Sequence, residues 1–371
     1  MSIPADIASL ISDKYKSAFD NGNLKFIQTE TTKTKDPKTS MPYLISHMPS
    51  LIEKPERGQT PEGEDPLGKP EEELTVIPEF GGADNKAYKL LLNKFPVIPE
   101  HTLLVTNEYQ HQTDALTPTD LLTAYKLLCA LDNEESDKRH MVFYNSGPAS
   151  GSSLDHKHLQ ILQMPEKFVT FQDRLCNGKE HFLPTFNTEP LQDAKVSFAH
   201  FVLPMPESEE TVDEDLLAMC YISILQRALT FFQDWLNENP ELKKSYNLML
   251  TKEWICVVPR SKAFSDEMKI GFNSTGYCGM ILTKNDEVFS KITEKPELIN
   301  DILLECGFPN TSGQKPNEYN YWVLHKYKYT RIHVCIYMYL NDRSNFYMYM
   351  SIQFLFLMTL KFYIYYSTLY Y

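Results

Sequence analysis

A short alternation of side chains constrains this chain more than any other feature of its sequence. Residues 155 to 160 read Asp-His-Lys-His-Leu-Gln, which places His156, His158 and Gln160 at every second position. Because successive side chains of a β-strand point to opposite faces, this spacing puts the three side chains on one face. Lys157 and Leu159 then fall on the other face. The segment predicts a β-strand, and so a β-sheet, with two imidazoles and an amide side by side.

A loop rich in glycine and serine precedes this strand, at residues 145 to 153. It offers two glycines, three serine hydroxyls near the strand and a run of backbone N–H groups, which suit a bound phosphate. By itself such a loop is often a flexible turn, and a bare His-x-His pair is more often a hydrogen-bonded core pair or a metal pair. The loop and the histidines together are far more specific. A neutral imidazole attacks phosphorus well when an acceptor holds its second nitrogen, so one histidine would attack while its neighbours orient it.

Hydrophobic periodicity and turn residues predict helices and strands around this segment. Thr117, Pro118 and Asp120 supply an N-cap, a proline at the first helical position and an acid in the first turn of a helix. The predicted helices are residues 3–20, 121–131, 213–237 and 296–306. The predicted strands are 90–92, 103–105, 141–144, 158–162, 246–250, 254–258 and 276–282, with 141–144 and 158–162 forming a hairpin.

Bulk properties exclude several classes of protein. At 371 residues the chain can bury one large core or two. Its 36 basic and 49 acidic residues give a net charge of −13, which argues against non-specific binding to nucleic acid or to an anionic membrane. The seven cysteines contain no Cys-x-x-Cys pair, so neither a disulfide framework nor a zinc site is indicated. With no secretory signal pattern at the N-terminus, we expect a cytoplasmic protein that also enters the nucleus.

Two segments are predicted to lie outside the packed core. Residues 53–73 hold four prolines and a single large apolar residue, so we expect a mobile, acidic surface loop that does not pack. Residues 322–371 contain 11 of the 22 tyrosines but no glycine, proline, alanine or glutamate. That bias is foreign to a folded domain and matches AT-rich codons, so we interpret the tail as translation past a natural end near Tyr321. The alternative is a membrane anchor that begins with the apolar run 346–360.

The run from Gly147 to Gln160 resembles the diadenosine tetraphosphate phosphorylases of fungi, also called ATP adenylyltransferases, of the histidine-triad superfamily. The resemblance covers residues 1–321 and excludes the tail. Other matching segments are 91–96, 183–187, 254–260, 273–280 and 306–311. It implies a single α+β domain over 1–321, in which a histidine-triad-like antiparallel sheet is flanked by helices.

The resemblance also implies a two-step nucleotidyl transfer. His158 would attack the α-phosphorus of diadenosine tetraphosphate, release ATP and form an adenylyl-histidine that inorganic phosphate opens to ADP. His156 and Gln160 would complete the catalytic set. The phosphate-binding donors would come from Asn145 and from the loop residues Gly151, Ser152, Ser153 and Leu154.

Gln160 stands where hydrolytic relatives carry a third histidine. An amide can bind phosphate oxygens but cannot titrate to activate water, which favours transfer over hydrolysis. Uridylyltransferases share the glutamine, yet they carry a proline where this chain has Lys157. Two alternatives stay open from sequence: a dinucleoside polyphosphate hydrolase, and a nucleotide-binding regulator that has lost turnover.

Further nucleotide contacts follow from matching motifs. By resemblance, the substrate-binding set also contains Lys54, Asn93, Lys94, Asn273, Ser274, Thr275, Met280 and Lys284. Without the resemblance, Lys54 is as easily a plain surface lysine, and Asn-Ser-Thr-Gly is an ordinary turn. We expect ATP, ADP and phosphate as ligands, with sulfate as an alternative acceptor in an ADP-sulfurylase side reaction. A divalent cation, Mg or Mn, is expected with the polyphosphate, without a protein-held metal site or an organic cofactor. We expect a monomer.

Overall fold

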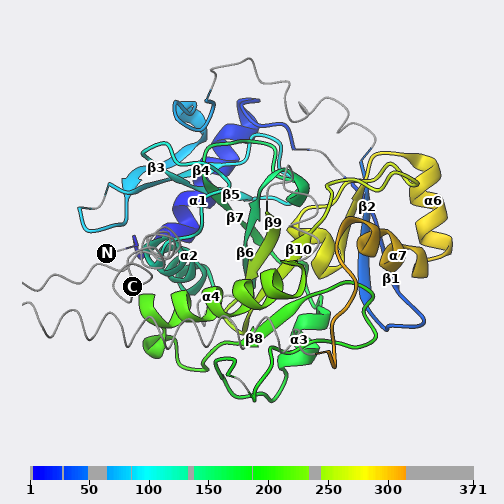
Figure 1. Cartoon of the computed structure of the whole chain (residues 1–371). Coiled ribbons are helices and arrows are strands. Elements are labelled where there is room, and N and C mark those ends of the chain that lie inside the picture. Colours follow the sequence, from blue (N-terminus) through cyan, green and yellow to red (C-terminus); the bar gives the residue numbers. More distant parts are fainter. Residues whose placement is uncertain are drawn as a thin grey trace, which may run out of the picture. The chain divides into compact units, whose positions relative to one another are not determined.

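A central antiparallel sheet positions the histidine motif (Figure 1). The computed structural model describes residues 3–26, 29–48, 65–84, 86–132, 138–185, 187–233 and 244–314. The predictions for Lys54 and for the tail 322–371 lie outside these residues. The sheet has eight strands in the order β3 (Thr75–Phe80), β4 (Tyr88–Leu92), β5 (Thr102–Thr106), β7 (His158–Gln163), β6 (His140–Ser146), β9 (Ser245–Leu250), β10 (Trp254–Arg260) and β8 (Phe201–Pro204). Every neighbouring pair in this sheet is antiparallel.

Both faces of this sheet are buried, which explains why its strands are apolar at nearly every position. On β9 and β10, Leu248 and Val257 pack into one hydrophobic cluster, whereas Met249 and Cys256 pack into the other. The first cluster includes α1 (Ile7–Asp20), α2 (Pro118–Leu131) and α4 (Glu214–Phe231). The second includes α3 (Phe171–Cys176), α6 (Asp286–Glu294), α7 (Glu297–Cys306) and the strand β2 (Pro42–His47). Leu159 and Ile161 of β7 join the first cluster, so alternation directs His158 and Gln160 to the second side.

A smaller three-stranded sheet lies beside α6 and α7 (Figure 1). Its order is β1 (Glu30–Lys35), β2 and β11 (Met280–Thr283), with β1 and β2 antiparallel and β2 and β11 parallel. Neither β1 nor β2 was predicted from the sequence. β1 is largely exposed and rich in threonine and lysine, so it lacks the apolar alternation that marks a strand.

Most of the predicted elements are confirmed. The capping box of α2 has the expected geometry, since the Thr117 hydroxyl accepts from Asp120 N at 3.1 Å and the Asp120 carboxylate accepts from Thr117 N at 2.8 Å. The hairpin of β6 and β7, the strands β4, β5, β9 and β10, and the helices α1, α4 and α7 all occur where predicted. The prediction of one strand over 276–282 is wrong at its start. A 3₁₀ turn (Ser274–Cys278) comes first, and Gly279, at φ +92°, separates it from β11.

Part of the acidic loop, residues 53–73, packs against the large sheet through Leu67. Leu67 is only 6% exposed and contacts the cluster of Leu91, Leu103 and Val105. The backbone carbonyl of Leu67 also accepts from the buried ammonium of Lys89 at 3.0 Å. The prediction that residues 53–73 do not pack is therefore wrong at Leu67, a single apolar anchor, whereas Glu71, Glu72 and Glu73 are exposed.

Within the described residues, no helix is long and apolar enough to cross a membrane.

The burial of His200 makes the free energy of unfolding depend on pH. The ring of His200 is fully buried and its Nε2 accepts from Asp193 N at 2.8 Å, which requires the neutral ring. Burial lowers the pKa of His200 to about 4 from the usual 6.5. Between pH 4 and pH 6.5, the unfolded chain therefore binds a proton on His200 that the folded chain does not bind. We expect the free energy of unfolding to fall by up to about 3 kcal/mol as the pH drops from 6.5 to 4.

Urea unfolding at a series of pH values would measure this loss. His200→Gln keeps an acceptor for Asp193 N and cannot titrate, so the variant should show a shallower decline over the same range. An equal slope in both proteins would rule His200 out as the cause.

Candidate active site

His158 is the first residue of β7, at the centre of the large sheet, and its side chain is 4% exposed. Its Nδ1 lies 2.8 Å from the backbone carbonyl oxygen of His156. A carbonyl only accepts, so Nδ1 carries the proton, and in the neutral ring the lone pair is on Nε2. The carbonyl also stabilises the cation that forms if Nε2 attacks. This is the arrangement that the sequence predicted for a nucleophilic histidine.

His156 is held on both sides. Its Nδ1 lies 2.8 Å from the Asp65 carboxylate, and its Nε2 lies 2.7 Å from the Thr106 carbonyl oxygen. Nε2 also lies 3.2 Å from the Thr106 hydroxyl, so both ring nitrogens have hydrogen-bond partners that fix the orientation of the ring. β7 begins only at His158, and His156 forms an isolated bridge to His111, outside the strands of the sheet. The prediction that His156 continues the strand ladder is therefore corrected.

Gln160 lies in β7 opposite Leu103 of β5 and Phe143 of β6, and its side chain is half-buried. It is two residues from His158, so strand alternation puts the two side chains on the same face. The amide can offer an N–H donor to a phosphate oxygen there but no titrating group.

Asn145 joins segments that lie far apart in the chain. Its Oδ1 accepts from Ser274 Oγ at 2.7 Å, from Ser274 N at 3.1 Å and from Asn247 Nδ2 at 2.8 Å. These bonds fix the orientation of the amide at the end of β6. They also bring together two predicted site residues, Asn145 and Ser274, which lie 129 residues apart in the chain.

A buried arginine, absent from the predicted set, completes this network. Arg260 is 2% exposed and donates to Asn247 Oδ1 at 2.6 Å, to the Phe272 carbonyl at 3.0 Å and to the Ser150 carbonyl at 3.3 Å. Its hydrogen-bond partners among the described residues are neutral oxygens, so no carboxylate there cancels its charge. The guanidinium adds positive potential beside the glycine- and serine-rich loop of residues 145–153, called the serine loop below. An arginine at the end of an otherwise apolar strand was the signal in the sequence.

The serine loop needs its glycines. Gly147 and Gly151 have φ values of +80° and +82°, in the left-handed region that favours glycine. A Cβ on Gly151 would collide with the backbone of Phe272 and Asn273. The loop can therefore approach the 273–275 segment closely only with glycine at 151. Ser152 is buried and donates to the Leu154 carbonyl at 3.0 Å, and Ser153 is half-buried.

Comparison with known proteins assigns the family. Residues 2–172 match the model of the Ap4A phosphorylase N-terminal domain, and residues 194–309 match that of the ATP adenylyltransferase C-terminal domain. Diadenosine 5',5'''-P1,P4-tetraphosphate phosphorylase 2 of Saccharomyces cerevisiae is 59% identical over 326 residues, which are 86% of this chain and 100% of the relative. The chain belongs to the Ap4A phosphorylase family. Both the resemblance inferred from the sequence and the α+β fold are thereby confirmed.

Solved structures of this Ap4A phosphorylase family share the fold. The crystal structure of yeast Ap4A phosphorylase Apa2 matches with a TM-score of 0.78 at 59% identity, over 86% of this chain and 99% of that one. The complex of Apa2 with Ap4A matches with a TM-score of 0.76 at 56% identity, over 84% of this chain and 100% of that one.

The hydrogen bonds and the ion pair found for the other predicted substrate-binding residues of this Ap4A phosphorylase family member do not involve His156, His158 or Gln160. Asn93 and Lys94 follow β4, where Asn93 Nδ2 contacts His101 Nδ1 at 3.1 Å and the Lys94 ammonium pairs with Glu71. Asn273 Oδ1 accepts from Thr275 N at 3.0 Å and from Thr275 Oγ1 at 2.6 Å, which caps the turn that holds Ser274. Met280 is buried at the start of β11, and Lys284 is exposed just after it. These hydrogen bonds and this ion pair run to local neighbours rather than to the histidine motif.

No group of three metal-binding side chains occurs among the described residues.

Proposed function

We propose that this protein cleaves diadenosine tetraphosphate with inorganic phosphate to give ATP and ADP. The observation that carries the proposal is His158 itself, with Nδ1 bonded to the His156 carbonyl so that Nε2 is the nucleophilic nitrogen. Family membership supports the substrate class, since yeast relatives are named for Ap4A and one was solved with Ap4A bound.

The chemistry follows from the groups in place. Nε2 of His158 attacks the α-phosphorus, an N–P bond forms, and the bond from that phosphorus to the bridging oxygen breaks to release ATP. A phosphate oxygen then attacks the same phosphorus, the N–P bond breaks, and ADP leaves. Each step builds negative charge on the α-phosphoryl oxygens. The N–H and hydroxyl groups of the serine loop supply fixed donors for it, and the charge of Arg260 beside Ser150 supplies positive potential.

Gln160 accounts for the choice of acceptor. Water needs a base to attack at neutral pH, whereas inorganic phosphate already carries ionised oxygens. No third imidazole stands at residue 160 to provide that base. The adenylyl-histidine should therefore await phosphate rather than hydrolyse quickly.

Product analysis with and without phosphate tests this function. We expect ATP and ADP in equal amounts with phosphate, and without it at most one ATP per enzyme molecule with the adenylyl group retained on the protein. ATP and AMP accumulating without phosphate would identify a hydrolase. Binding of Ap4A without any ATP release would identify an inactive regulator.

Several further properties belong to the same proposal. We propose that Mg or Mn enters on the polyphosphate, because four adjacent phosphates attract a divalent cation and the described residues offer no cluster to hold one. Phosphate is the proposed acceptor, with sulfate as an alternative acceptor in a side reaction. The proposed state is a cytoplasmic monomer, also present in the nucleus; the six described cysteines are free thiols, as suits a reducing compartment.

A further inference from the structure

The ladder between β6 and β7 stops just before the nucleophile. Its register runs from His140 opposite Gln163 to Phe143 opposite Gln160. Continued by two residues, the same register would bring Asn145 opposite His158, but there the side chain of Gln112 lies between the two strands. Gln112 Nε2 donates to the Asn145 carbonyl at 3.0 Å and to the His158 carbonyl at 3.1 Å. Its Oε1 accepts from His158 N at 2.8 Å.

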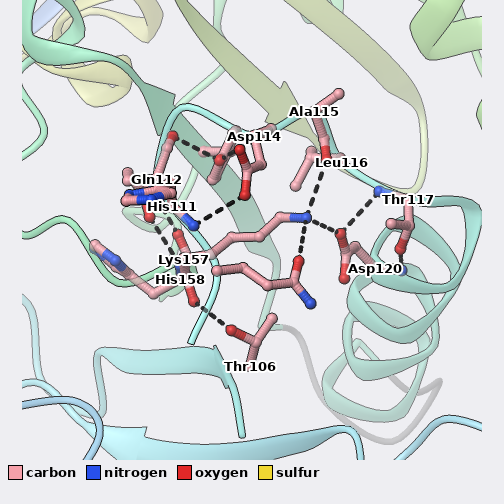
Figure 2. Close-up of polar contacts among 12 residues, drawn as sticks. Thr106, His111, Gln112, Asp114, Ala115, Leu116, Thr117, Asp120, Lys157 and His158 are labelled. Carbon is pink, nitrogen blue, oxygen red and sulfur yellow. Dashed lines mark hydrogen bonds and ion pairs between the residues drawn. The ribbon is translucent and has the colours of Figure 1, made fainter. Parts of the chain in front are cut away.

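Gln112 thus takes the place of a strand partner. A residue in a ladder normally exchanges both its N–H and its C=O with one neighbour, and for His158 the neighbour on this side is the Gln112 amide. The side chain is 2% exposed, and Figure 2 shows Gln112 beside His158. A glutamine is one of few side chains that can donate and accept at once in this geometry.

The backbone of Gln112 is itself held to the histidine motif and to β6. Its N–H donates to the Asp155 carbonyl at 2.7 Å, and its carbonyl accepts from the Tyr144 hydroxyl at 2.7 Å. The main chain that carries the Gln112 amide is therefore fixed at the same place as the amide itself.

The loop around Gln112 is anchored again on the other side of the sheet. Lys157 N donates to the Gln110 carbonyl at 2.8 Å, and the Lys157 ammonium donates to Gln110 Oε1 at 3.1 Å and to the Ala115 carbonyl at 3.0 Å. Figure 2 shows this ammonium among Ala115, Thr117 and Asp120. The main-chain N–H and the buried ammonium of Lys157 therefore both hold residues 110–115 against the histidine motif.

We infer that Gln112 is a positioning residue for the transfer reaction. The inference rests on the proposed role of His158. Gln112 fixes the main chain of His158 while the His156 carbonyl fixes the ring, so the direction of Nε2 depends on both. It also holds the main chain of Asn145, whose amide orders Ser274. A small rotation of this backbone would turn Nε2 away from the in-line path to phosphorus, and a misplacement of about 1 Å costs about 10²-fold in rate.

Gln112→Glu and Gln112→Met test the inference. The first variant keeps the shape of the side chain but removes the N–H donors to both carbonyls, and the second removes donors and acceptor alike. We expect kcat and the single-turnover rate of adenylyl-enzyme formation to fall by about 10²-fold in both, with KM for Ap4A within about threefold of the wild-type value.

Gln172→Ala is the matched control. Gln172 is also fully buried, and its amide donates to the Tyr277 carbonyl at 3.1 Å, away from the histidine motif. We expect this variant to lower Tm while kcat, measured well below Tm, stays within about twofold. A drop in kcat like that of the Gln112 variants would show that lost stability alone explains them.

Other outcomes are equally decisive. Gln112→Glu with near-normal kcat would overturn the inference, as would a rise in KM without a change in kcat. If the wild-type protein forms no adenylyl-enzyme, the proposed function fails instead, and the two failures are thereby separated. Should Gln112→Met not fold, Gln112→Glu still decides, because it differs from the native side chain by a single group.

Discussion

Replacing His158 with alanine is expected to lower kcat for Ap4A cleavage by about 10⁴-fold or more. The variant retains the serine loop, Arg260 and Gln160, so Ap4A should still bind with KM or Kd within about tenfold of the wild-type value. What it loses is the nitrogen that the geometry presents as nucleophile, Nε2 of a ring whose Nδ1 is bonded to the His156 carbonyl. Chromatographic separation of ATP, ADP and AMP during turnover, with and without phosphate, gives the measurement.

His181→Ala serves as the control for this experiment. His181 is half-buried, and its Nδ1 contacts the Pro204 carbonyl at 2.7 Å at the end of β8, on the far side of β6, β9 and β10 from β7 in the sheet. We expect kcat of His181→Ala to stay within about twofold of the wild-type value. Retention of more than about 1% of wild-type kcat in His158→Ala would mean that another group attacks, and the assignment of the nucleophile would be lost.

Local signals in the sequence predicted what local physics determines. The capping box at Thr117 and Asp120 needs only four consecutive residues, and the hairpin of β6 and β7 needs only alternation on either side of a glycine-rich loop. Both are confirmed. The acceptor for one ring nitrogen of His158 is local too, since the His156 carbonyl lies two residues away, whereas the choice of His158 as nucleophile came from the family resemblance and stays a prediction.

The rest of the site depends on contacts that no local pattern records. Asn247 gives no signal in the sequence, and the charge of Arg260 at the end of an apolar strand does not reveal its partner until the fold brings the two residues to Asn145 and Ser150. Gln112 lies in a segment with no motif, and its role arises because two strands part at that point. The acidic loop shows the opposite error. Its composition predicted exposure, yet the Asp65 carboxylate is a partner of His156 across 91 residues.

Lys157 and Asp120 form the buried ion pair whose disruption should cost the fold most. Their side chains are 0% and 3% exposed, and the ammonium lies 2.6 Å from the carboxylate. The Lys157→Met variant fills similar space but leaves the Asp120 carboxylate, among the described residues, with the Tyr88 hydroxyl and Thr117 N as its donors. A charge buried without its counter-ion is costly, so we expect the free energy of unfolding to fall by about 3–5 kcal/mol. Urea unfolding, with midpoint and slope fitted separately, measures the loss.

A double-mutant cycle separates the pair from the packing of the lysine chain. Asp120→Asn keeps the cap acceptor at the start of α2 while removing the charge, so Lys157→Met combined with Asp120→Asn should recover at least about 1–2 kcal/mol relative to the sum of the single losses. The exposed pair of Lys86 and Glu79, at 4.0 Å with side chains 66% and 56% exposed, gives the comparison, and Lys86→Met should change stability by less than about 0.5 kcal/mol. If Lys157→Met cost no more than Lys86→Met, the pair would contribute nothing to stability. In that case the lysine between the two histidines would hold the 110–115 loop through its carbonyl contacts alone, and kcat would fall in the variant without a matching fall in Tm.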